Sequence, residues 1–197
     1  MPNPENTGAA PAVSGERMLS PLDNANSYGL ISRLNHWLGA ALVIALLGIG
    51  LYFADMPRGP DKLFWMKLHF SIGTLAFLPL AFRIAWRLKS AGPAAFAQPL
   101  LLQRLTSLVH GVLLLGIGIL IVSGPFTVWT AGRAIEVFGW FSLPSPTGEM
   151  KTAHEVLENI HVITANVLLW TVVLHVLGAA KHLLFERERL TGRMFGR

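Results

Sequence analysis

Four long apolar stretches limit what this chain can fold into. They lie at about residues 31–54, 63–86, 105–126 and 160–185, and Gly-Pro pairs at 59–60 and 92–93 mark breaks between the first three. A membrane-spanning helix needs about 20 predominantly apolar residues, and each stretch reaches that length. In lipid only helices and closed barrels satisfy all backbone hydrogen bonds. The sequence therefore predicts an all-α fold, a four-helix transmembrane bundle in the lipid bilayer, with its last helix running from about residue 150 to 185.

Composition supports a membrane protein and excludes several kinds of redox centre. The mean hydropathy is +0.50, 52% of residues are hydrophobic and only 14% are charged, unlike a soluble domain. In so apolar a chain the net charge of +5 indicates basic loops and not a nucleic-acid partner. There are no cysteines. This excludes disulfides, iron–sulfur clusters, thiolate-bound haem and covalently attached c-type haem.

The charged residues predict which side of the membrane each loop faces. Residues 1–30 are polar and non-periodic, so they predict a flexible tail and no signal peptide, and residues 191–197 form a basic tail. Of the 16 Lys and Arg residues, we count 11 in the two tails and the second loop with its flanks, and 5 on the opposite side. Both termini are therefore predicted to be cytoplasmic. In a bacterium the opposite face would be the periplasm.

Histidines recur along the last apolar stretch with a helical spacing. They stand at positions 154, 161, 175 and 182 and form one slowly winding stripe, because seven residues are just under two helical turns. His161 and His175 lie within the apolar run, about 21 Å apart along the helix. Ionisable side chains are costly in lipid and usually face the interior of a bundle. Imidazole is also an axial ligand of haem iron.

Depth in the membrane pairs these two histidines with others. His36 near the start of the first helix and His175 share one depth, while His69 near the start of the second helix and His161 share the other. The sequence thus predicts two bis-histidine haem b sites stacked across the membrane, with these four residues as metal ligands. His110 in the third helix lies near the depth of His175 and remains an alternative to His36.

Several other polar residues are candidates for cofactor binding. Haem propionates need cationic partners, and Arg83 and Arg33 lie at the depth of the cytoplasmic site. Snorkelling towards lipid phosphates is the alternative role for both. His182 continues the histidine stripe towards the cytoplasm and is a candidate hydrogen-bond donor to a quinone, or simply an interfacial polar residue. No residue is predicted to be catalytic, since irons with two axial histidines leave only the haem edge for electron exchange.

Each of the four apolar stretches contains a histidine motif: LNHWLG, KLHFSIG, LVHGVLL and IHVITANVLLWTVVLHVLGAAKH. These motifs resemble those of the bacterial cytochrome b561 family, and the similarity covers about residues 28–190. The resemblance implies a di-haem inner-membrane protein with His36, His69, His161 and His175 as axial ligands. It also implies transmembrane electron transfer coupled to ubiquinone.

The resemblance leaves two activities open. Some family members are similar to superoxide oxidases, which oxidise superoxide at the periplasmic face and reduce ubiquinone. Others are non-enzymatic relay or anchor subunits that pass electrons between the quinol pool and a periplasmic redox partner. A third alternative, a histidine-rich metal or proton transporter without haem, is disfavoured because the four apolar spans lack Asp and Glu.

Overall fold

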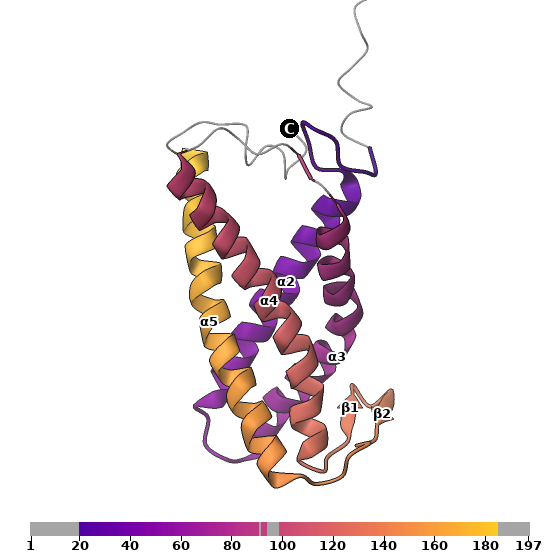
Figure 1. Cartoon of the computed structure of the whole chain (residues 1–197). Helices are drawn as coiled ribbons and strands as arrows, with labels where there is room; N and C mark the ends of the chain where they lie inside the picture. Colours follow the sequence, from indigo (N-terminus) through magenta and orange to yellow (C-terminus); the bar gives the residue numbers. More distant parts are fainter. Residues whose placement is uncertain (1–19, 91, 94–98, 185–197) are drawn as a thin grey trace, which may run out of the picture.

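Four long helices make up most of the computed structural model, which describes residues 20–90, 92–93 and 99–184 (Figure 1). Their bounds are α2 Leu30–Ala54, α3 Pro60–Lys89, α4 Leu100–Thr130 and α5 Lys151–Leu184. All four are long and apolar enough to cross a membrane. The prediction of an all-α, four-helix transmembrane bundle is confirmed.

The helices extend beyond the predicted apolar spans at several ends. The second begins at Pro60, which suits the first helical turn because proline lacks an amide hydrogen that this turn would leave unpaired. The third runs from 100 to 130, whereas the apolar pattern indicated 105 to 126, and it continues through Pro125. Membrane helices tolerate such prolines because neighbouring groups satisfy the freed backbone. Much of the helix surface is exposed apolar side chain, with Leu78 74% and Trp170 70% exposed, as lipid contact requires.

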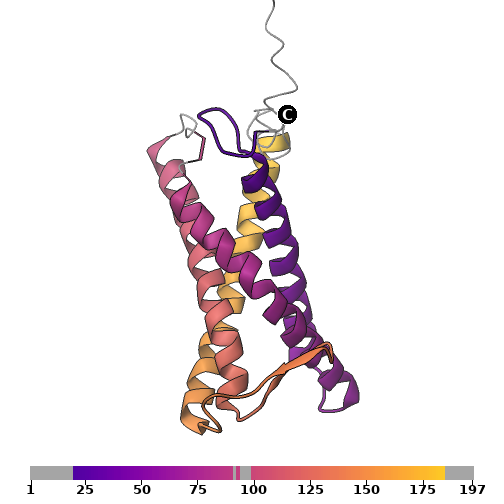
Figure 2. The same ribbon diagram turned by 90° about the vertical axis from the view of Figure 1, so that its right-hand side faces the viewer.

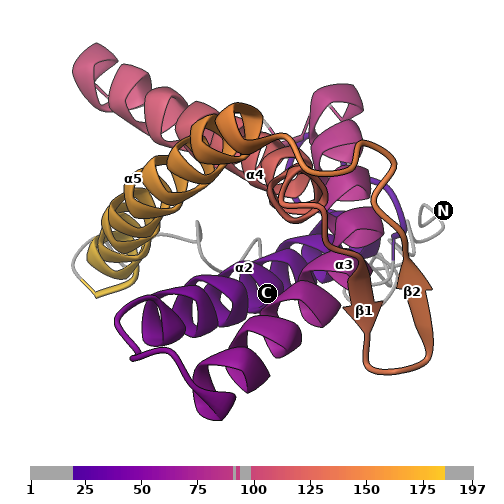
Figure 3. The same ribbon diagram turned by 90° about the horizontal axis from the view of Figure 1, so that it is seen from below.

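The helices pack as two pairs. α2 lies along α3 and α4 lies along α5, with α3 and α4 in contact between the pairs, whereas α2 and α5 scarcely touch. Figures 1 and 3 show the pairs as two slanted layers, and Figure 2 shows the same bundle from its side. One apolar core joins the layers, formed by the buried side chains of Val43, Leu47, Ala76, Leu80, Ile117 and Leu168. The bundle is therefore closed at its centre by these contacts while α2 and α5 remain apart.

A short β-hairpin follows α4, where the aromatic-rich third loop gave no indication of strands. Its strands, β1 Ile135–Val137 and β2 Phe141–Leu143, pair antiparallel. Val137 is completely buried, and the hairpin lies against α3. The Ser71 hydroxyl donates to the Glu136 carbonyl (3.1 Å) and accepts the Phe138 amide (3.1 Å). The hairpin marks one end of the bundle, which we call the hairpin end; the opposite end, where α2 begins and α5 ends, is the terminal end (Figure 1).

Part of the predicted N-terminal tail contacts the terminal end. Residues 1–19 and the C-terminal tail 191–197 lie outside the described residues, but residues 20–29 turn back towards α2 and α3. Asp23 accepts hydrogen bonds from the Gly29 amide (2.7 Å), the Ser32 hydroxyl (2.9 Å) and the Ser90 hydroxyl. The start of α2 is thereby tied to the end of α3.

Candidate functional site

His36 and His175 face each other at the terminal end. His36 comes from the second turn of α2 and His175 from the last third of α5, so they reach the same level from opposite layers. Their ring centroids are 6.4 Å apart, with the ring planes at 58°. Both side chains are half-buried. We call these two residues the terminal-end pair.

His69 and His161 form a matching pair at the hairpin end. His69 lies in the third turn of α3 and His161 in the third turn of α5. Their ring centroids are also 6.4 Å apart, with the planes at 84°. We call these residues the hairpin-end pair. The structure thus brings together the four histidines that helix depth had paired.

The separation within each pair suits one metal ion between two imidazoles. Metal–nitrogen bonds of about 2.0 Å, with about 1.2 Å from each nitrogen to its ring centre, give a centroid separation of about 6.3 Å. Both observed separations agree with this value. Among the described residues no group of three or more His, Asp or Glu side chains is placed to hold a metal ion. Each pair could therefore supply two of the ligands of a metal-bearing cofactor that brings the remaining ligands itself, such as a haem.

His110 does not fit as the opposite ligand to His175. Their ring centroids are only 5.2 Å apart in an edge-to-face contact, too close to hold an iron between them. His110 is also exposed on the surface of α4. The geometry therefore favours His36 over His110.

Arg83 lies beside the terminal-end pair. Its Nη1 donates to the Asn35 carbonyl (3.3 Å), and its Nη2 lies 3.3 Å from His36 Nδ1. The side chain crosses α2 at Gly39, where a Cβ atom would lie only 2.7 Å from Arg83 Cδ. The missing side chain of Gly39 therefore lets a charged residue of α3 reach His36 on α2.

The hairpin-end pair has neutral neighbours. The Ser123 hydroxyl on α4 lies 2.9 Å from His161 Nδ1. Gly124 lies against the same ring, and Gly50 on α2 lies against His69; at both glycines an added Cβ would be 3.4 Å from the ring. His69 Nδ1 is buried without a well-aligned hydrogen bond. Small residues on the facing helices thus leave the two rings close to neighbouring backbone.

The sequence analysis did not identify these neighbours. The glycines that contact the rings of His69 and His161 lie on helices α2 and α4, which carry neither of these two histidines. Ser123 is a lone hydroxyl in an apolar run, and its place at 2.9 Å from His161 depends on how α4 is rotated. That rotation is a result of packing.

The remaining sequence candidates are Arg33 and His182. Arg33 is half-buried in the first turn of α2. The side chain of His182 is outside the described part of the chain, so its predicted contact with a quinone has no structural counterpart here. His154 Nδ1 donates to the Thr127 carbonyl (2.9 Å), which ties α5 to the end of α4. Its Nε2 lies 3.8 Å from a Glu158 carboxylate oxygen one turn along α5.

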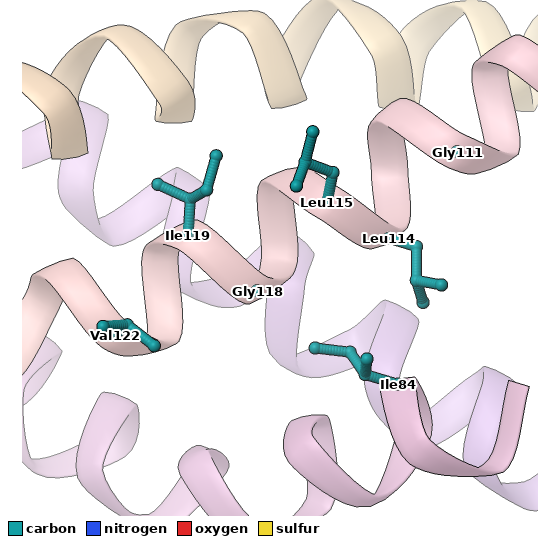
Figure 4. Close-up of a pocket in the computed structure, with 7 residues that line it drawn as sticks. All are labelled: Ile84, Gly111, Leu114, Leu115, Gly118, Ile119 and Val122. Atoms are coloured by element: carbon teal, nitrogen blue, oxygen red, sulfur yellow. The ribbon is translucent and has the colours of Figure 1, made fainter. Parts of the chain in front are cut away.

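An apolar groove runs along α4 beside α3 (Figure 4). It has a volume of about 570 Å³ and begins at Gly111, next to His110 in the chain. Its lining residues are Ile84, Gly111, Leu114, Leu115, Gly118, Ile119 and Val122. The two glycines leave space that larger residues would fill, so the groove suits a long apolar chain.

Two comparisons with known proteins agree with this arrangement. The sequence profile of a family described as prokaryotic cytochrome b561 matches residues 27–197. The chain is also 30% identical over 181 residues to a protein of Escherichia coli (strain K12) named cytochrome b561 homolog 2. That alignment covers 86% of this chain and 92% of the relative. The family match therefore spans all four helices.

Proposed function

Because the chain belongs to the prokaryotic cytochrome b561 family, whose members bind haem b and transfer electrons in membranes, we propose that it carries electrons across the bilayer through two b haems. The observation that carries this proposal is the equal 6.4 Å separation in two histidine pairs at opposite ends of the bundle. We assign one haem to His36 and His175, and the other to His69 and His161. When bound, the haems supply reversible one-electron redox chemistry.

The residues of the chain hold and isolate these groups. Each histidine pair would supply two imidazole ligands to its haem. The scarcity of contact between α2 and α5 supports this assignment, because a macrocycle needs space between the layers. The apolar core between the two levels keeps water out of the path.

We propose Arg83 as the cationic partner of a propionate of the terminal-end haem, with Arg33 as a second candidate. A guanidinium only donates hydrogen bonds, so in the present contact Arg83 uses the lone pair of His36 Nδ1. A histidine that binds iron through Nε2 keeps its proton on Nδ1. Arg83 is therefore expected to exchange its His36 contact for the propionate when the haem binds.

Orientation and the membrane-soluble carrier complete the proposal. The excess of Lys and Arg at the terminal end supports a cytoplasmic location for that end and a periplasmic location for the hairpin end. We propose ubiquinone as the electron acceptor or donor in the bilayer. The groove of Figure 4 supports it, because an isoprenoid tail is a long apolar chain and the groove is apolar along its length.

Haem counting tests the ligand assignment. A dithionite-reduced minus air-oxidised spectrum with a pyridine haemochrome count should give two low-spin b haems per purified chain. His36→Ala should lose one haem, whereas the matched variant His110→Ala should keep both. A well-folded protein without haem would overturn the proposal. Retention of both haems in His36→Ala, with loss of one in His110→Ala, would reassign the ligand.

A second assay separates the two proposed activities. Of the two activities, we favour superoxide oxidation at the hairpin end, with the electron passed on to ubiquinone. Superoxide-dependent reduction of a short-chain ubiquinone by the isolated protein would support it. Absence of turnover alone, with rapid haem reduction by a co-purified redox protein, would instead support the relay or anchor function.

A further inference from the structure

We propose that Ser123 is a positioning residue for His161, and that its hydrogen bond makes the hairpin-end haem the harder of the two to reduce. The inference rests on the proposed function, because it requires His161 to bind iron. It also predicts the direction of electron transfer. The difference between the two midpoint potentials would make transfer from the hairpin-end haem to the terminal-end haem energetically favourable.

The contact is buried and close. Ser123 is only 3% exposed, and its Oγ lies 2.9 Å from His161 Nδ1. The next residue, Gly124, has no side chain to hold α4 away from the ring, and an added Cβ there would lie 3.4 Å from His161 Cε1. The sequence Ser123-Gly124 therefore supplies both the hydroxyl and the close approach that it needs.

The chemistry of the imidazole fixes the direction of this hydrogen bond. When Nε2 binds iron, the proton is on Nδ1, so His161 donates and the Ser123 oxygen accepts. Such an acceptor holds the ring in one orientation and raises the basicity of the ligand. A more basic ligand stabilises ferric over ferrous iron. The midpoint potential of the hairpin-end haem is lowered as a result.

The terminal-end pair has the opposite bias. There the neighbouring polar group is the Arg83 guanidinium, which has donors only and lies 3.3 Å from His36 Nδ1 in the present structure. Beside His36 or beside a haem propionate, it cannot act as the acceptor that Ser123 provides, and its positive charge favours the less positive, ferrous site. One electron leaving the hairpin-end haem and reducing the terminal-end haem therefore moves to the higher potential, and the step needs no proton.

A spectroscopic redox titration of the purified holoprotein tests the inference. The variants are Ser123→Ala, which removes the acceptor, and Ser123→Thr, which keeps a hydroxyl. The control is Thr171→Ala, since that hydroxyl donates within its own helix to the Val167 carbonyl (2.7 Å). Arg83→Gln identifies the terminal-end haem by lowering its potential.

In Ser123→Ala we expect the lower of the two midpoint potentials to rise while the other stays in place. A loss of roughly tenfold in the preference for ferric iron corresponds to about 59 mV for a one-electron couple. Ser123→Thr should restore the lower potential, and Thr171→Ala should not change either. Selective loss of the lower-potential haem in Ser123→Ala, restored in Ser123→Thr, would also support the positioning role.

Two outcomes count against the inference, and they differ from failure of the proposed function. Two retained haems with unchanged potentials in Ser123→Ala would overturn the role of Ser123 and leave the di-haem assignment standing. If Ser123→Ala shifted the same midpoint potential that Arg83→Gln shifts, the assignment of Ser123 to the hairpin-end haem would be overturned. Wild-type protein without haem would overturn both proposals.

Discussion

At the residue scale, Gly39 decides where Arg83 lies. An added Cβ would meet Arg83 Cδ at 2.7 Å, so the side chain of Arg83 must move if residue 39 is any other amino acid. Gly39→Ala should therefore displace the guanidinium from the terminal-end site, where we propose that it pairs with a haem propionate, and lower the midpoint potential of that haem. Overpacking of this kind costs about 1–3 kcal/mol of stability. Redox titration and thermal unfolding in detergent measure the two effects.

Gly48 provides the control on the same helix. Nothing lies within 4 Å of a Cβ added at Gly48, so Gly48→Ala should leave the potential unchanged and should not destabilise the protein. If Gly39→Ala behaved like Gly48→Ala in both measurements, Arg83 would not depend on Gly39.

The four paired histidines were predictable residue by residue, whereas their neighbours were not. Sequence position fixes depth, because a helix rises about 1.5 Å per residue, so His161 and His175 had to lie at different levels. Rotation about the helix axis is set by packing between helices. That is why the contacts of Ser123, Gly50 and Gly124 with the rings became visible only in three dimensions.

At the scale of single elements, the β-hairpin depends on Ser71 of α3. The Ser71 hydroxyl both donates to the Glu136 carbonyl and accepts the Phe138 amide, and the nearby Lys67–Glu136 ion pair is exposed and adds little. Ser71→Ala should release the hairpin at a cost of about 1–3 kcal/mol, because it leaves polar groups without partners. Hydrogen–deuterium exchange of residues 135–143 should increase. Ser142→Ala, a change at an exposed position of the same hairpin, should not alter this exchange. Equal exchange in the two variants would contradict the role of Ser71 in holding the hairpin.

The segment before α2 should show acid sensitivity through Asp23. Burial acts to raise the pKa of Asp23, but hydrogen bonds from Ser90, the Gly29 amide and Ser32, with the charge of Arg87, lower it below 3.8 overall. Because the folded pKa is below the unfolded one, the carboxylate stabilises the fold above a pH of about 4. This stabilisation is lost as the pH falls below 3.8 towards the folded pKa. The Tm difference between wild type and Asp23→Asn should therefore be largest near neutral pH and disappear in acid; a constant difference would contradict it.

These two elements also show what the sequence could not indicate. Strands of three residues are too short to carry a two-residue periodicity, so Ile135–Val137 and Phe141–Leu143 looked like loop. The contact of Asp23 with Ser90 joins the segment before α2 to the residue that caps α3, and no local sequence pattern indicates it. The four long helices were predictable because the bilayer imposes their length and composition.

At the scale of the whole molecule, the charges are unevenly distributed between the two ends. The hairpin end carries nearly balanced charge, with the basic residues Arg58, Lys62, Lys67, Arg133 and Lys151 and the acidic residues Asp55, Asp61, Glu136, Glu149, Glu155 and Glu158. Two of the lysines are already engaged. Lys62 donates to the carbonyls of Ala54 and Met56, and Lys67 pairs with Glu136. The hairpin end therefore has one more acidic than basic residue, and the net charge of +5 comes from the rest of the sequence.

This balance predicts how a superoxide anion would reach the hairpin end. Electrostatic steering needs a positive local field, and its rate enhancement falls steeply as salt screens that field. With engaged lysines and nearby carboxylates, superoxide-dependent haem reduction should change by less than about twofold between 20 and 200 mM salt. Stopped-flow reduction over this range, with superoxide dismutase abolishing the signal, measures it. A steep decline that Arg58→Gln removes would show instead that a local cationic patch around Arg58 guides the anion, despite the neutral balance of the whole face.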